Sequence, residues 1–152
     1  MIDPGHWLWR LDAAGWAAAA EIEWTAANEN VARRRTALAH CRRAAGMALN
    51  GVLVAWGRTS APDAPNVAVI WGRSYVEHLQ RIAAGEHGPL AIDAVALASG
   101  ILATPITAAP LVTLGAHAHA DVTAVLGHTR RLIDACAAAT ARLQPTARPR
   151  DL

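Results

Sequence analysis

The sequence has no phenylalanine, no lysine, one tyrosine and two cysteines in 152 residues. Two cysteines are too few for a disulfide framework in a chain of this length. We therefore expect Cys41 and Cys136 to be buried free thiols, as in a reducing cytoplasm. All fourteen cations are arginine and thirty-seven residues are alanine, so we attribute the missing lysine to high-GC codon usage rather than to chemistry.

Charged residues are also scarce, at 17% of the chain against a usual share of about a quarter. Together with a hydrophobic content of 53%, this argues against a disordered linker and for a chain that buries a real core. The length and the absence of an internal repeat indicate one domain, which we place at residues 1–143. The Pro- and Arg-rich end, residues 144–152, is expected to be a disordered tail.

Targeting and membrane signals are missing as well. Asp3, Pro4 and His6 stand where a signal peptide would have a basic region, and no apolar region follows them. Residues 94–116 carry no charge and are long enough to span a bilayer, but Pro105 and Pro110 interrupt them. The sequence therefore predicts a cytoplasmic protein with no membrane contact.

Recognisable catalytic motifs are absent too. The glycines form neither a dinucleotide-binding nor a P-loop pattern, and no serine or cysteine lies in a nucleophile motif. We expect no cofactor, and we lean against an enzyme.

What the sequence has in abundance is helix signal. Alanine has the highest intrinsic helix propensity, and the apolar residues recur at helical spacing. We predict an all-α fold, an up-and-down antiparallel bundle of about five helices over residues 5–27, 30–56, 74–85, 89–102 and 121–143. A single tract with β character, residues 66–71, lies between the second and third helices.

Capping residues indicate where these helices begin. Asn30 is the expected N-cap of the second helix, and Ser74 and Glu77 have the spacing of a capping box at the start of the third. Pro89 is expected in the first turn of the fourth helix, and Asp121 at the N-cap of the last.

The first two helices are apolar over unusually wide arcs. In the first, one stripe at helical spacing is flanked by Trp9 and Trp16, which suggests contact with two partners. In the second, Met47 and Val54 lie opposite the main apolar face, so we expect its C-terminal half to be buried all round. The stripe on the first helix consists of Leu8, Leu11, Gly15, Ala19, Ile22 and Ala26.

The charges are unevenly distributed along the chain. Residues 1–30 hold five acids and one base, whereas residues 31–58 hold six arginines and no acid. Two antiparallel helices of opposite charge attract each other, so we expect ion pairs between them. The alternative is a nucleotide- or RNA-binding face made of Arg33, Arg34, Arg35, Arg42 and Arg43.

A longer pattern joins the second and third helices. Residues 42–53 read RRAAGMALNGVL, a proline-containing loop follows, and residues 71–79 read WGRSYVEHL. This resembles the HEPN superfamily of small helical domains, in which an A-x-x-A-L-x-x-x-L helix precedes a G-H-D-L-x-x-L-L turn. The resemblance covers about residues 8–142 and implies a bundle of four or five helices that often dimerises. Known members divide between metal-independent RNases and nucleotide-binding or scaffold domains.

The HEPN RNases use an Arg-x(4–6)-His motif near the start of a late helix, where arginine stabilises phosphate charge and histidine transfers a proton. The equivalent region here, residues 95–122, contains no arginine. The spacing occurs instead at Arg35 and His40, which diverge in mid-helix, and at Arg73 and His78. Arg73 and His78 are therefore the catalytic candidates. The alternative is an arginine near a helix cap and a histidine on a helix surface.

Four residues make a weak candidate metal site. His117, His119 and Asp121 have an H-x-H-x-D spacing, and His128 lies two helical turns further on. Imidazole and carboxylate ligands of this kind suit Zn²⁺ or Ni²⁺. The alternative, which we favour, is that Asp121 caps a helix and the two earlier histidines lie in a loop.

The leading hypothesis from the sequence is a non-catalytic, HEPN-like interaction or scaffold protein that forms a homodimer and has a protein partner. The excess apolar surface of the first or last helix would be buried between the two copies. The alternatives are a toxin-like RNase and a module that binds a nucleotide or RNA.

Overall fold

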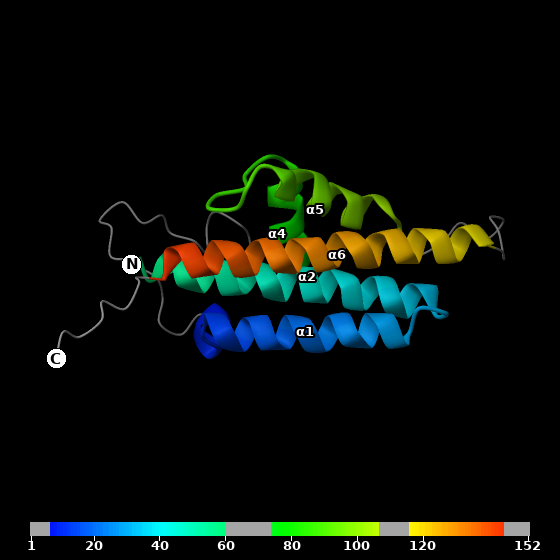
Figure 1. Ribbon diagram of the computed structural model, residues 1–152, viewed down its shortest axis with the longest axis horizontal. Coiled ribbons are helices and arrows are strands. Elements are labelled where there is room, and N and C mark those ends of the chain that lie inside the picture. The colour runs from blue at the N-terminus through cyan, green and yellow to red at the C-terminus, as the bar shows by residue number, and fades with distance from the viewer. Residues whose placement is uncertain (1–6, 60–73, 107–115, 145–152) are drawn as a thin grey trace.

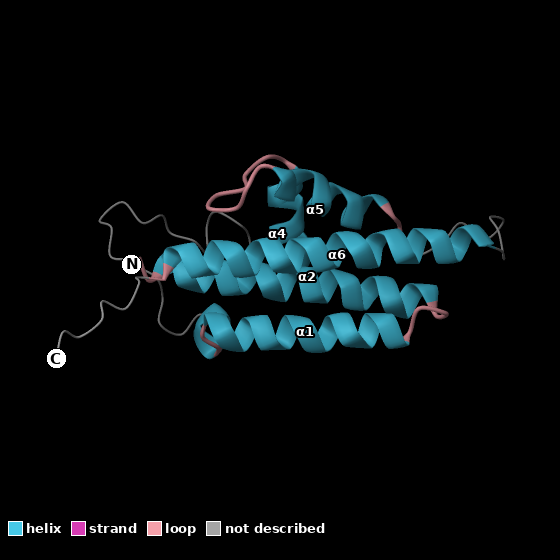
Figure 2. Ribbon diagram, viewed as in Figure 1, coloured by secondary structure: helices cyan, strands magenta, loops and turns pink. Residues whose placement is uncertain are grey.

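The computed structural model describes residues 7–59, 74–106 and 116–144, which form helices joined by turns, without a strand among them (Figure 2). A 3₁₀ helix, η1 (Trp7–Arg10), precedes α1 (Ala13–Glu29) and α2 (Arg34–Gly57). The remaining helices are α4 (Tyr75–Ala83), α5 (Asp93–Ala103) and α6 (Ala116–Leu143). The predicted all-α fold is thus confirmed for these residues. The predicted β tract, residues 66–71, lies outside them, as does the end of the chain from residue 145.

The helices are arranged around α2 (Figure 1). α1 lies along one side of α2 and runs antiparallel to it, whereas α4 and α5 lie on the opposite side of the pair formed by α2 and α6. α2 packs against all four of the other α-helices that the structure describes. α1 and α5 run in one direction and α2 and α6 in the other, so these four helices alternate along the chain.

The central position of α2 agrees with its composition. Residues 44–55 are buried, apart from the partly exposed Met47, so the expectation that this half of the helix is buried all round is confirmed. A helix that is apolar on every side needs neighbours on every side. The other helices therefore have to surround it.

Glycine allows two of those neighbours to come close. A Cβ atom on Gly46 would lie 2.4 Å from the Cβ of Tyr75 in α4, which is a severe overlap. A Cβ atom on Gly51 would lie 3.2 Å from the carbonyl oxygen of Ala13 in α1. Both glycines thus mark places where another helix rests directly on the α2 backbone.

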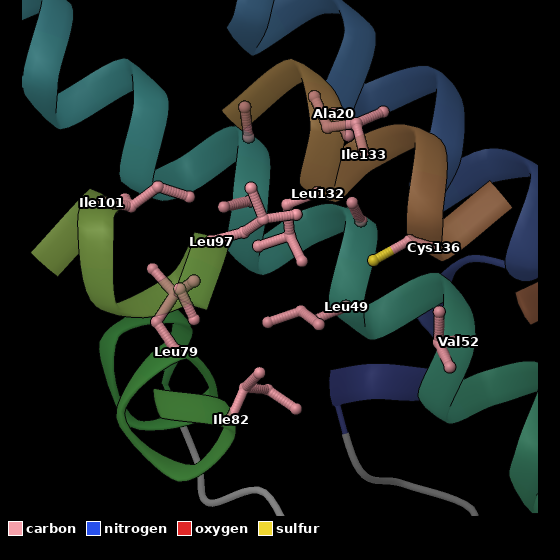
Figure 3. Close-up of a cluster of buried hydrophobic side chains, with 14 of the residues drawn as sticks. Ala20, Leu49, Val52, Leu79, Ile82, Leu97, Ile101, Leu132, Ile133 and Cys136 are labelled. Atoms are coloured by element: carbon pink, nitrogen blue, oxygen red, sulfur yellow. The ribbon is translucent and has the colours of Figure 1, made fainter. Parts of the chain in front are cut away.

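Aliphatic side chains from α2, α4, α5 and α6 meet in one core (Figure 3). Cys41 and Cys136 belong to it as buried free thiols, as predicted, and burial raises the pKa of both. Both therefore serve as small hydrophobic residues. The buried aliphatic residues labelled in the close-up include Leu49, Val52, Leu79, Ile82, Leu97, Ile101, Leu132 and Ile133.

The predicted boundary between the first two helices is wrong. Asn30 ends α1 instead of starting α2, because its backbone N–H and its side-chain amide both donate to the carbonyl of Ala26. α2 begins at Arg34, without a side-chain cap. Asparagine is suited to either end of a helix, so its presence alone does not decide which helix it caps.

Both ends of α4 follow local rules. The Ser74 hydroxyl accepts a hydrogen bond from the N–H of Glu77, so the predicted cap is confirmed. At the other end Gly85 has φ +100°, and its N–H donates to the carbonyl of Ile82 while that of Glu86 donates to Arg81. This is a Schellman motif, which satisfies carbonyls that the helix end leaves open.

The predicted starts of the last two helices are wrong. α5 begins at Asp93, and Pro89 lies in the turn before it, where its carbonyl accepts a hydrogen bond from Arg142. α6 begins at Ala116, so Asp121 lies inside the helix and is not its N-cap. Alternating alanines before Asp121 have enough helix propensity to extend the helix past a favourable capping residue.

No described helix has the length and apolarity that a membrane span requires.

A matched pair of glycine variants tests the close packing on α2. Gly46→Ala should lower the free energy of unfolding by roughly 1–3 kcal/mol, because the new methyl group overlaps Tyr75. Gly127→Ala, on the exposed surface of α6 with nothing within 4 Å of the added atom, should raise it by about 0.5–1 kcal/mol. Urea denaturation measures both. Equal effects of the two substitutions would contradict the packing described for Gly46.

Candidate functional site

Two of the arginines proposed to bind nucleic acid attach α2 to the end of α5. Arg42 donates to the carbonyls of Leu102 and Thr104, at 3.4 and 3.1 Å, and Arg34 donates to that of Ile106 at 3.0 Å. The last carbonyls of a helix have no hydrogen-bond partner within it. A cation at this end also interacts favourably with the helix dipole. Burial lowers the pKa of Arg42, in keeping with this enclosed position.

The other three arginines of the predicted cluster do not join them. Arg33 and Arg35 lie exposed near the start of α2. Arg43 is one turn beyond His40, and its Nε donates to Glu23 of α1 at 2.9 Å. The structure therefore divides the five arginines among three separate environments, and no continuous basic track forms within the described residues.

Glu23, His40 and Arg43 form a half-buried cluster between α1 and α2. The Glu23 carboxylate lies 2.6 Å from His40 Nδ1 and accepts the bond from Arg43 at the same oxygen. Burial is the largest single influence on Glu23 and acts to raise its pKa. Hydrogen bonds from His40 and Arg43 together outweigh it, so the pKa of Glu23 lies below its ordinary value of 4.5. The expected ion pairing between the first two helices is therefore present here.

A second charged cluster ties α1 to α6, which the charge distribution did not predict. Arg130 donates two hydrogen bonds to Glu21, both of 2.7 Å, and also bonds Asp134. Its guanidinium lies 5.0 Å from the centre of the Trp24 ring, and the Trp24 indole N–H donates to Leu126 of α6. The hydrogen bonds to Arg130 are the main reason that the pKa of Glu21 is lowered.

The structure does not place His78 where a substrate could reach it. The ring is 1% exposed and stacks on Trp7, with centroids 6.3 Å apart and planes inclined by 16°. A general acid or base must come within hydrogen-bond distance of the reacting group. The alternative expectation, a histidine on the surface of the helix, is also wrong. Arg73 lies outside the described residues, so its relation to His78 stays a prediction.

The four candidate metal ligands all lie on α6. The helix includes positions 117 and 119, so the two histidines expected in a loop are helical. Asp121 is exposed, while His128 packs against the backbone of Gly100 in α5. Among the side chains that the structure describes, no three histidines, cysteines or carboxylates come together as a metal site.

One residue that the sequence analysis passed over is Asn50. It is fully buried in α2, and neither its amide nitrogen nor its oxygen has a hydrogen-bond partner among the described residues. Leaving such a group without a bond costs about 1–3 kcal/mol. The sequence feature that could have indicated this residue is the single amide side chain of Asn50 in an otherwise apolar part of the helix.

The outer face of α1 is the clearest candidate for an interaction surface. Of the apolar stripe predicted for this helix, Ile22 is 71% and Leu11 39% exposed, and Leu8 is buried. Gly15, Ala19 and Ala26 are half-buried. The buried side of α1 is formed instead by Ala13, Trp16, Ala20 and Ala27. Ala18, Thr25 and Glu29 share the exposed side at helical spacing and are themselves exposed. No described element covers this face (Figure 1).

A shallow groove runs next to this face, between α1 and α6. It has a volume of about 220 Å³, and Ala48 and Gly51 of α2 form its floor. Small side chains open the groove, because two helices lined with alanine leave space that larger residues would fill. Its walls include Ala14 and Ala17 of α1 and Ile133, Ala137 and Ala141 of α6.

The cluster at Glu23 should make stability depend on acidity. A carboxylate whose pKa is lowered in the folded protein stabilises the fold above its unfolded pKa, and that contribution is lost as pH falls through the folded value. Glu23→Gln should therefore lower the free energy of unfolding by about 0.2–1 kcal/mol at pH 7. The difference from wild type should shrink below pH 4.5, the ordinary value for this group.

Thermal denaturation of both proteins between pH 7 and pH 3 measures this difference. Asp121→Asn, at an exposed carboxylate without an ion pair among the described residues, is the control and should change stability little at any pH. A gap between wild type and Glu23→Gln that stays constant with pH would count against the cluster.

Comparison with known proteins identifies no relative. No protein-family model matches the sequence, no curated protein matches it, and no solved structure matches the fold. The resemblance to the HEPN superfamily therefore stays a prediction, and the function has to be argued from the contacts described above.

Proposed function

We propose that this protein is a HEPN-like helical interaction module that acts as a homodimer and has no catalytic role of its own. The observation that carries the proposal is Ile22, which is 71% exposed in the middle of the outer face of α1. A large aliphatic side chain contributes about 1.5–3 kcal/mol when it is removed from water. A second copy of the same surface would remove two such side chains from water at once.

The surroundings of Ile22 support an interface. Leu11 precedes the N-cap Asp12 and lies against Gly15 of α1. On this side of α1 the residues between Gly15 and Ile22 are Ala18 and Ala19, whose small size lets another helix approach closely. α1 is connected to α2 by the ion pairs of Glu23 and to α6 by the ion pair of Glu21.

The chemistry of the charged residues favours this function over an RNase or a nucleotide-binding module. Arg34 and Arg42 donate to backbone carbonyls, and Arg43 donates to Glu23. His78 is buried against Trp7. These three guanidinium groups already have partners within the fold, whereas Arg33 and Arg35 are exposed.

Two isoleucines of equal exposure provide the test. Ile22→Glu should abolish dimerisation, with a loss of roughly 2 kcal/mol for each of the two copies and a rise in Kd on the order of a thousandfold. Ile92, also 71% exposed, precedes α5 on the far side of the bundle from α1. Ile92→Glu should leave the dimer unchanged.

Sedimentation velocity over a range of protein concentrations distinguishes the outcomes, with circular dichroism to verify that both variants stay folded. A wild-type protein that remains a monomer at high micromolar concentration would refute the proposal. Equal loss of dimer in both variants would show that the outer face of α1 is not the interface.

A further inference from the structure

A second hollow lies at the end of the bundle where α2 and α6 end and α1 begins (Figure 1). Its volume is about 380 Å³, at the small end of the range for pockets that hold small molecules. We call this hollow the terminal pocket. Its lining residues are Ala13, Ala55, Arg58, Thr59, Arg142, Leu143 and Gln144.

The charged residues that line the terminal pocket are two arginines from different helices. Arg58 is the C-cap residue of α2, Arg142 lies in the last turn of α6, and both are exposed. No carboxylate belongs to the described lining. Asp12 is next to Ala13 in the chain, but its carboxylate accepts a hydrogen bond from the N–H of Gly15 and does not line the pocket. The lining side chains therefore carry positive charge only.

These two arginines do not satisfy the ends of the helices on which they lie. Arg34 and Arg42 perform that role at the end of α5, where they donate to backbone carbonyls. Arg142 instead donates one hydrogen bond of 3.3 Å to Pro89, and the Arg58 side chain donates to no described residue. A guanidinium has five N–H donors, so most of these donors can bond a ligand.

The helix ends around the terminal pocket reduce its positive charge without cancelling it. The C-terminal ends of α2 and α6 each act as about half a negative charge, against one full positive charge on each arginine. At the start of α1, the negative charge of Asp12 is partly offset by the positive end of the helix dipole. An excess of positive charge remains at the two guanidinium groups.

An anion is the ligand that these two arginines suit. Two like charges on one hollow repel each other, and an anion between them replaces that repulsion by attraction. Guanidinium groups bind phosphate through pairs of parallel hydrogen bonds. A phosphomonoester has a charge of about −1.5 to −2 near pH 7, which is the charge that two arginines can balance.

The remaining lining residues indicate what the phosphate is attached to. Ala13, Ala55 and Leu143 form an apolar wall beside the arginines. The Thr59 hydroxyl already donates to the carbonyl of Trp56 at 2.7 Å, so toward a ligand it can only accept. It therefore cannot bind the anion as a donor. A phosphate with a small apolar group attached would use both the charged and the apolar parts of the lining.

We propose that the terminal pocket binds a small organic phosphomonoester. The phosphate lies between the guanidinium groups of Arg58 and Arg142, and the organic group contacts Leu143 and the neighbouring alanines. This inference goes beyond the proposed interaction module. It does not depend on the homodimer, because Ile22 does not line the terminal pocket.

Phenyl phosphate is the probe for this site, added to the full-length chain at low salt and followed by ¹H–¹⁵N NMR. Arg58→Gln and Arg142→Gln should each raise its Kd at least about tenfold, because each removes hydrogen bonds from a charged donor. Arg35→Gln and Arg131→Gln are the matched controls, since both arginines are exposed on the same two helices but do not line the pocket. These controls should leave the Kd unchanged.

Leu143→Ala tests the apolar wall separately from the charge. It should weaken binding of phenyl phosphate about threefold and leave binding of inorganic phosphate unchanged, because only the ester has a group that contacts the wall. Benzoate should bind more weakly than phenyl phosphate, since its carboxylate has a single charge. Circular dichroism verifies that every variant keeps its helices.

Three results would overturn the proposal. The first is a wild-type protein whose spectrum does not change at about 10 mM phenyl phosphate. The second is an equal loss of binding in the pocket variants and the matched controls, which would show attraction by net charge alone. The third is a short 5′-phosphorylated RNA that binds through Arg58 and Arg142 when phenyl phosphate does not, which would assign these residues to a nucleic-acid end.

Discussion

The burial of α2 on all sides is the constraint on which the rest of the structure depends. A helix of small and branched apolar residues cannot be stable in water alone, so every other α-helix that the structure describes packs against it. Gly46 and Gly51 set how closely α4 and α1 approach. Because the α2 backbone is the surface on which its neighbours rest, a single methyl group at Gly46 is expected to disturb the contact between two helices.

Enclosing α2 leaves the other helices with different amounts of free surface. α6 is held between α1, α2 and α5, so its apolar face is used within the chain. α1 contacts α2 and α6 on one side, and its opposite side exposes Ile22, with Leu11 exposed just before the helix. Val76 and Ile92 are exposed elsewhere on the molecule. The groove beside α1 follows from the same alanine-rich packing.

The charged residues mainly hold this arrangement together. Arg42 satisfies carbonyls at the end of α5, and the clusters around Glu23 and Arg130 connect α1 to α2 and α6. These partners are far apart in the sequence. Arg34, Arg42 and Arg43 therefore form separate structural contacts, whereas Arg33 and Arg35 remain exposed. The two clusters pair the Glu21 and Glu23 carboxylates of α1 with arginines of the neighbouring helices.

Local residue order by itself determined the helical class, the buried half of α2 and the Ser74 cap, because propensity, apolar spacing and capping act within a few residues. Helix ends were less predictable where two signals competed, as at Asn30 and Asp121. Which side of the wide apolar arc on α1 is buried was decided by the tertiary structure. Trp16 and Ala20 fit against α2 and α6, and Ile22 does not. An apolar pattern records that a surface avoids water, whereas the shape of the neighbouring helices selects which surface they cover.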